Sequence, residues 1–281
     1  MGPGRVAPWR RGRSSSAAKD QVTEGAADAP PSPGTGPIVA ARGVGVRIDD
    51  ADLLLPVTFD LGAGQALAVR GPNGSGKTTL LRVVAGLTAP TSGTVHVGGR
   101  PPDDRDRRFR ARLAALVGPP PLARNLTLLE HLALVGASWG STTADATEHG
   151  HGLLTDLGID RLARRFPHEL SSGQAQLFAL ALTLARPADV LLLDEPEQRL
   201  DAERLEMVAD LLRDIVDAGT TLLVASHSPA LVERVADATV VLGSTSGVDD
   251  LGSPGHPRDL ADLGAQSDPE EPDGRRNPVR A

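Results

Sequence analysis

The amino-acid sequence predicts an α/β fold, with a mainly parallel sheet flanked by helices, from three observations. Short β-rich runs alternate with helical patterns throughout residues 37–243. The run VLLLD at 190–194 is apolar without alternation, as is typical of a strand buried on both faces of a sheet. A glycine-rich stretch at 71–76 joins a strand pattern directly to a helical one. Strands separated by helices pair in parallel, because each helix carries the chain back across the sheet.

The expected elements can be placed along this region by their apolar periods and flanking residues. The strands are short and mostly apolar, and they are expected at 65–70, 93–99, 113–117, 189–195, 220–226 and 238–243. The helices carry apolar residues at helical spacing, and they are expected at 78–86, within 127–166, and at 173–185, 202–216 and 229–236. Thr127 and Glu130 have the spacing of a capping box, which marks the start of the second helical section.

Composition separates the two ends of the chain from this region. Residues 1–36 and 244–281 are poor in apolar residues, so we expect a disordered leader and a disordered tail around one domain at 37–243. The formal net charge of −7 argues against a nucleic-acid partner. The sequence has no cysteine, which excludes disulfides and thiolate metal sites. Its apolar runs are far shorter than the roughly 18–20 residues of a membrane span, so we expect the chain in the cytoplasm.

The glycine-rich stretch has the residues of a phosphate-binding loop. Residues 71–78, GPNGSGKT, fit the pattern G-x-x-x-x-G-K-[ST] between a strand and a helix, which is the context that this motif requires. Glycines allow positive φ angles and bring successive N–H groups to phosphate oxygens, and the helix N-terminus adds its dipole. Lys77 is the only lysine of the domain, and its compact ammonium suits a gap between two phosphates better than a guanidinium does. We expect phosphate binding by Gly71, Pro72, Asn73, Gly74, Ser75, Gly76, Lys77, Thr78 and Thr79.

Polar residues that end two later strands are expected at the same edge of the sheet. Asp194 and Glu195 end the VLLLD strand, and His227 directly follows the strand at 220–226. After a phosphate-binding loop, Thr78 and Asp194 supply oxygen ligands for Mg²⁺. Glu195 is placed to orient and deprotonate an attacking water, and His227 to touch the γ-phosphate.

These motifs occur, together with LSSGQ at 170–174 and Asp201, in the order and spacing of an ABC-type ATPase. The region 37–243 resembles the nucleotide-binding subunit of an ABC transporter. The resemblance implies a P-loop NTPase core with an N-terminal antiparallel β part and an inserted helical subdomain at about 119–175. It also implies ATP and Mg²⁺ as cofactors, and Lys77, Glu195 and His227 as the catalytic residues.

The same resemblance implies two kinds of partner. In that family two ATP-binding domains pair head to tail, so we expect a second copy of this chain or a paralogous ATP-binding subunit. The signature residues would cap the γ-phosphate held by the other subunit, and they are Ser171, Ser172, Gly173 and Gln174. Asp201 would couple the two sites. A separate integral-membrane permease would hold the chain at the inner face of the cell membrane and convert hydrolysis into transport.

Two alternative functions stay open. One is a soluble ABC ATPase that acts on ribosomes or DNA, although members of those groups carry two nucleotide-binding domains or a long coiled-coil insertion. The other is a slow regulatory nucleotide-binding module.

The sequence departs from the family pattern in several respects, including the absence of two arginines that are common in the helix after the signature. No glutamine lies between residues 66 and 173, so the side chain that usually reaches the metal from this region is missing, and Gly118 takes its place. Ser172 stands where the signature usually has glycine. The stretch VGVRIDD has no aromatic residue to stack on the base, so we expect apolar contact from Ile48 or Val46 and weak selectivity for ATP over GTP.

Overall fold

The computed structural model of this chain describes residues 36–243 and 249–250. The predicted disordered leader and tail lie outside this described part, apart from Gly36 and the short strand β9. The strands are β1 (Val39–Ile48), β2 (Ala51–Leu61), β3 (Ala66–Arg70), β4 (Ser92–Val97), β5 (Leu113–Leu116), β6 (Val190–Asp194), β7 (Thr221–Ala225), β8 (Ala238–Val241) and β9 (Asp249–Asp250). The α-helices are α1 (Lys77–Val84), α2 (Arg107–Arg110), α3 (Leu128–Ser138), α4 (Thr143–Asp156), α5 (Ser172–Leu184), α6 (Ala202–Asp217) and α7 (Pro229–Val235).

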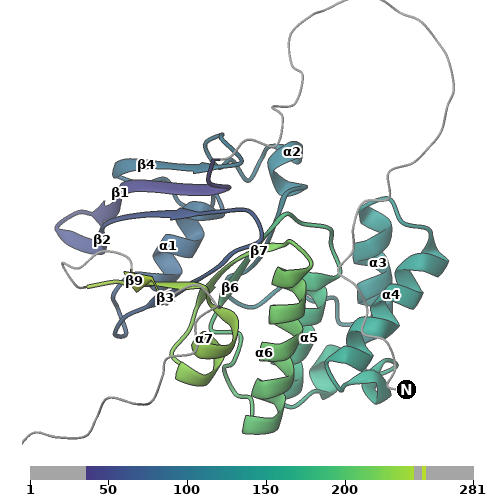
Figure 1. Cartoon of the computed structure of the whole chain (residues 1–281). Helices are drawn as coiled ribbons and strands as arrows, with labels where there is room; N and C mark the ends of the chain where they lie inside the picture. Colours follow the sequence, from purple (N-terminus) through teal and green to yellow (C-terminus); the bar gives the residue numbers. More distant parts are fainter. Residues whose placement is uncertain (1–35, 244–248, 251–281) are drawn as a thin grey trace, which may run out of the picture.

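The central sheet has six strands in the order β5-β6-β7-β3-β8-β9. The first five strands pair in parallel, and β9 is antiparallel to β8. The five parallel strands overlap those expected from the sequence at 65–70, 113–117, 189–195, 220–226 and 238–243. Helices lie on both faces of the sheet (Figure 1). The predicted α/β fold with a mainly parallel sheet is therefore confirmed.

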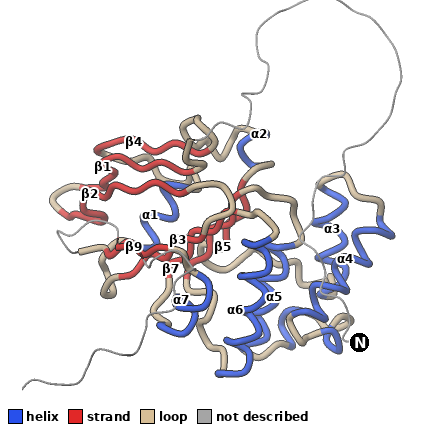
Figure 2. Tube along the Cα trace, viewed as in Figure 1, coloured by secondary structure: helices blue, strands red, loops and turns tan. Residues whose placement is uncertain are grey.

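A second, antiparallel sheet has the order β2-β1-β4. Figure 2 shows it as a separate layer of strands, with α1 between it and the central sheet. Of its strands only β4 was expected from its own pattern, whereas the other two were implied by the family resemblance alone. The ladder between β1 and β2 has register shifts between Ala41 and Val44 and again between Val44 and Val46. These irregularities break the alternation of apolar and polar residues that would have marked β1.

The residues between β5 and α5 form a helical part, which Figure 1 shows on the far side of the molecule from the antiparallel sheet. Its helices α3 and α4 pack closely because each has a glycine at the contact. A Cβ on Gly136 would lie 2.7 Å from that of Ala146, and one on Gly150 would lie 2.8 Å from that of Leu132. The predicted capping box of Thr127 opens α3. In the described part of the chain, no helix is both long and apolar enough to cross a membrane.

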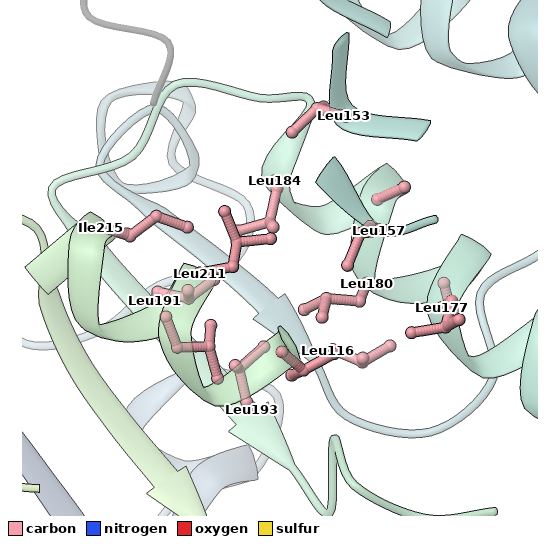
Figure 3. Close-up of a cluster of buried hydrophobic side chains, with 14 of the residues drawn as sticks. Leu116, Leu153, Leu157, Leu177, Leu180, Leu184, Leu191, Leu193, Leu211 and Ile215 are labelled. Carbon is pink, nitrogen blue, oxygen red and sulfur yellow. The ribbon is translucent and has the colours of Figure 1, made fainter. Parts of the chain in front are cut away.

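The central sheet is buried on both faces. Alternate residues of β6 enter different clusters: Leu191 and Leu193 face α5 and α6, whereas Val190 and Leu192 belong to the cluster that contains α1 and the antiparallel sheet. Figure 3 shows the first cluster as leucines from the sheet, from α4, α5 and α6 filling one shared space. Burial on both faces explains why VLLLD shows no alternation.

Candidate functional site

Three segments with candidate functional residues meet at one edge of the central sheet. The phosphate-binding loop follows β3, Asp194 ends β6 with Glu195 directly after it, and His227 follows β7. In the sheet β6 is hydrogen-bonded to β7, and β7 to β3, all in parallel. Their carboxyl ends therefore lie side by side, which is where α/β sheets bind ligands.

The phosphate-binding loop is shaped by glycines and by contact with β2. Gly74 and Gly76 have φ angles of 81° and 95°, in the left-handed region that favours glycine. A Cβ on Gly76 would lie 2.5 Å from the carbonyl oxygen of Leu53, so the antiparallel sheet packs directly against this loop. Lys77 opens α1 and is 6% exposed. Its Nζ donates to the carbonyl oxygens of Gly71 (3.0 Å) and Pro72 (3.1 Å), which holds the ammonium inside the loop.

Thr78 and Asp194 are brought together as candidate metal ligands. The Thr78 hydroxyl donates to Asp194 Oδ2 at 2.7 Å. Burial raises the pKa of the Asp194 carboxyl. The Thr78 hydrogen bond and the charge of Lys77 lower this pKa, whereas the charges of Glu195 and Glu197 raise it further. Both groups offer hard oxygen donors, and a cation would offset the cost of ionising a buried carboxyl, so the pair fits Mg²⁺. The described residues contain no group of three or more His, Cys, Asp or Glu that could hold a metal ion.

The candidate base Glu195 lies against the candidate γ-phosphate residue His227. The two side chains approach to 3.3 Å between His227 Nε2 and Glu195 Oε1, and both are partly exposed, at 43% and 33%. The other carboxylate oxygen accepts from Gln198 Nε2 at 3.1 Å. Glu195 has a φ of 48°, which is uncommon for a residue with a side chain. Such a backbone conformation persists at sites where the surrounding contacts hold it in place.

The signature residues form the first turn of α5. Ser171 is its N-cap, accepting from the Gln174 N–H at 3.3 Å, and the Gln174 side chain accepts from the Ser171 N–H at 3.0 Å. Ser171 and Ser172 are exposed, whereas a Cβ on Gly173 would lie 2.7 Å from the carbonyl oxygen of Arg199. The two bonds between Ser171 and Gln174 form a capping box that fixes this turn.

Asp201 caps the next helix. It is the N-cap of α6, and its Oδ1 accepts from the Arg204 N–H at 2.9 Å. Its side chain is 62% exposed and also lies 3.7 Å from the Arg204 guanidinium. Asp201 therefore stabilises the start of α6, in addition to the coupling role that the family resemblance implies.

Three residues of this region were missed by sequence reasoning: Gln176, Glu197 and Gln198. Gln176 donates from α5 to the carbonyl oxygens of Glu195 (3.2 Å) and Pro196 (3.3 Å). Glu197 accepts from the segment around His227. No motif or periodicity marks these residues. Gln176 and Glu197 bond groups that are distant in the sequence, and Gln198 donates to the side chain of Glu195.

The structure also bears on the departures from the family pattern. Gly118 follows β5, at the outer side of β6, and its φ of 82° is in the glycine-favoured region. Val46 is 2% exposed and belongs to the core, so the expectation that it could contact a base is wrong. Ile48, at the end of β1, is 53% exposed and can make such a contact.

Comparisons with known proteins identify relatives of this chain. The model of the family described as ABC transporter matches residues 54–198. A Brucella suis protein named among ABC transporter ATP-binding proteins is 37% identical over 73% of this chain and 86% of its own length. The Nod factor export ATP-binding protein I of Ralstonia nicotianae is 30% identical over 76% of this chain and 67% of that protein. The sulfate/thiosulfate import ATP-binding protein of Rhizobium meliloti is 36% identical over 70% of this chain, but this chain covers 55% of its length.

Solved structures show the same fold. An ATP-binding subunit of an ABC transporter matches with a TM-score of 0.68 and 26% identity, over 76% of this chain and 90% of that one. A dimeric ATP-binding cassette solved in a post-hydrolysis state with ADP and Pi matches with a TM-score of 0.68 and 24% identity, over 76% of this chain and 99% of that one.

Proposed function

We propose, from the premise that this chain belongs to the ABC transporter family, that it hydrolyses ATP to drive transport through a separate membrane permease. The observation that carries the proposal is the meeting of Lys77, the Thr78–Asp194 pair and the Glu195–His227 pair at one sheet edge. Relatives named as ATP-binding proteins of export and import systems support a transport role for the chain.

Nucleotide binding is assigned to the loop after β3. Lys77 Nζ would exchange its contacts with the carbonyls of Gly71 and Pro72 for phosphate oxygens, which its flexible stem allows. The N–H groups of residues 74–79 and the N-terminus of α1 would bind the remaining phosphate oxygens. Thr78 and Asp194 would hold Mg²⁺, which neutralises phosphate charge when bound.

Hydrolysis is assigned to the side chains after β6 and β7. Glu195 would accept a proton from the attacking water, because its carboxylate is partly exposed beside the metal ligands. His227 would hold the γ-phosphate in line with the water that Glu195 activates, since His227 Nε2 lies 3.3 Å from Glu195 Oε1. Gln198 orients the second oxygen of Glu195. Gly118 supplies no side chain to this site, so we expect turnover to be slow unless a partner completes it.

Pairing with a second ATP-binding subunit would complete the site. Ser171 and Ser172 are exposed at the N-terminus of α5, where a helix attracts anions. In a head-to-tail pair they would cap the γ-phosphate bound by the other subunit, which is either a second copy or a paralogue. The permease would hold this pair at the inner face of the cell membrane, and nucleic acid has no part in this scheme.

Replacing Glu195 by glutamine tests the chemistry. We expect Glu195→Gln to bind ATP like the unmodified chain but to lose at least about 100-fold in turnover, since a general base contributes roughly 10²–10⁴-fold. Turnover within a few-fold of the unmodified chain would remove Glu195 from the role of base. Glu206→Gln, on the exposed side of α6, is the matched control and should leave turnover unchanged.

An affinity pull-down of the full chain from detergent-solubilised native membranes tests the transport role. A polytopic membrane protein recovered in stoichiometric amount is the expected result. Recovery of ribosomal or DNA-repair components without a membrane protein would instead favour the soluble ABC ATPase. Turnover that stays negligible even with the recovered membrane partner would favour the regulatory module.

A further inference from the structure

Glu197 connects the loop that carries the catalytic base to the segment that carries His227. Its Oε1 accepts from the Ser226 hydroxyl at 2.5 Å, from the His227 N–H at 2.9 Å and from the Ser228 N–H at 3.3 Å. Ser226 is fully buried, and its hydroxyl in turn accepts from the Ser228 N–H at 3.0 Å. One carboxylate oxygen thus holds three consecutive residues at the point where the chain leaves β7.

We propose that Glu197 is a positioning residue for ATP hydrolysis, and that it acts by fixing the backbone from which His227 reaches Glu195. This inference rests on the proposed function, because it concerns the same reaction. Glu197 itself need not touch the nucleotide. Its effect is on the 3.3 Å contact between His227 and Glu195, whose two backbones it ties together.

The loop after β6 needs such a restraint because its backbone is strained. Glu195 and Arg199 have φ angles of 48° and 67°, and neither is glycine. From one side, Gln176 of α5 holds the carbonyls of Glu195 and Pro196. From the other side, Glu197 holds residues 226–228. With Glu197 removed, the Gln176 bonds would still restrain the loop, but the segment of His227 could move away from it.

The pattern of contacts shows which property of Glu197 matters. All three of its donors meet Oε1, whereas Oε2 is buried and has no hydrogen-bond partner in the described part of the chain. A glutamine keeps an acceptor oxygen for the same donors; its amide would lie where Oε2 is buried without a partner, which lowers the stability of the fold but leaves the bonds to residues 226–228 in place. A leucine has similar size but leaves the buried Ser226 hydroxyl and the His227 N–H without their acceptor, whereas the Ser228 N–H keeps its bond to the Ser226 hydroxyl. We therefore predict that turnover depends on the acceptor oxygen at this position and not on its negative charge.

ATP turnover of the full chain tests this in Glu197→Gln, Glu197→Leu and Glu206→Leu. We expect Glu197→Gln and the exposed control Glu206→Leu to keep kcat within about 3-fold. We expect Glu197→Leu to lower kcat by at least about 20-fold with KM for ATP within about 3-fold. Equal losses in the glutamine and leucine variants would overturn the proposal, because charge and not acceptor geometry would then be responsible.

A double-mutant cycle with His227→Ala distinguishes positioning from general damage. If Glu197 acts through His227, Glu197→Leu should change kcat by less than about 2-fold in the His227→Ala background. Losses that multiply would contradict the proposal. Thermal unfolding checks that each variant is folded, and Glu197→Ala replaces Glu197→Leu, with the same thresholds, if leucine prevents folding.

Hydrogen exchange of the His227 and Ser228 amides gives a readout that does not depend on turnover. Exchange at His227 should be at least about 10-fold faster in Glu197→Leu and unchanged in Glu197→Gln, with a smaller rise at Ser228, whose N–H also donates to the Ser226 hydroxyl. Unchanged exchange in Glu197→Leu would overturn the proposal. If the unmodified chain failed to hydrolyse ATP, the proposed function would fail, and this exchange would still decide whether Glu197 restrains His227.

Discussion

Replacing Gly76 by alanine tests whether the phosphate-binding loop owes its shape to contact with β2. Gly76 has a φ of 95°, and a Cβ there would lie 2.5 Å from the Leu53 carbonyl oxygen and 3.1 Å from the Leu54 Cα. Gly74 has a similar φ of 81°, but a Cβ there would have no atom within 4 Å. Both positions therefore require a positive φ, but only Gly74 leaves space for a side chain.

The expected loss of stability follows from this difference. A left-handed backbone costs alanine about 1–2 kcal/mol, of which the reduced entropy of the unfolded chain offsets about 0.4–1 kcal/mol. Gly74→Ala should therefore lose about 1 kcal/mol. Overpacking against backbone atoms adds about 1–3 kcal/mol, so Gly76→Ala should lose about 2–4 kcal/mol. At roughly 2–4 °C per kcal/mol for a domain of this size, Tm should fall by about 2–4 °C and about 4–16 °C respectively.

Thermal unfolding of the nucleotide-free chain, followed by circular dichroism, measures both changes in one buffer. Gly74→Ala is the control for backbone strain, so the difference between the two Tm values isolates the contact with β2. Equal Tm values for the two variants would refute the argument that this contact fixes the loop. A competition assay with a fluorescent nucleotide should also show weaker ATP binding by Gly76→Ala, because relieving the overlap moves the residue before Lys77.

Two further predictions concern the metal ligand and the base contact. Burial holds the pKa of Asp194 above its ordinary value, so the stability of the fold falls as the pH rises through the folded-state pKa of this carboxyl. Asp194→Asn removes the charge, so it should raise Tm at pH 8 and raise it less near pH 4. The same substitution should abolish turnover, because it removes a metal ligand. A lower Tm than the unmodified chain at pH 8 would contradict this sign. Ile48→Tyr places a ring on the exposed end of β1, where stacking worth about 1–3 kcal/mol should tighten ATP binding by roughly 5- to 150-fold. An unchanged dissociation constant would show that Ile48 does not contact the base.

The central sheet could be predicted from the sequence because its local signals agree with its tertiary environment. In β6 both faces are buried, and an unbroken apolar run is the direct result. In β1 the sequence pattern does not indicate a strand, because Gly43 and Gly45 interrupt the apolar residues. The strand forms nevertheless, pairing with β2 and β4 across register shifts. Its stability comes from partners on both sides, and a single strand's pattern does not contain that information.

The same distinction holds within the site. Lys77, Thr78 and Asp194 could be found because their chemistry is tied to short sequence patterns. Gln176 and Glu197 could not, since each bonds backbone groups brought near by folding: Gln176 reaches residues 195–196, and Glu197 reaches residues 226–228. A glutamine on an apolar helix and a glutamate after a strand are ordinary residues until their partners are known.

The contacts of α5 show how one chain could relay the state of its partner to its own catalytic base. The first turn of α5 would contact the partner's nucleotide through Ser171 in the proposed head-to-tail pair. Two residues on, Gly173 lies against the carbonyl of Arg199, and Gln176 holds the carbonyl of Glu195. A helix is stiff over this distance, so a shift of its N-terminus would reach the loop of Glu195 directly, without passing through the sheet. Through its bond from the His227 N–H, Glu197 would connect the same loop to His227 in the proposed pair.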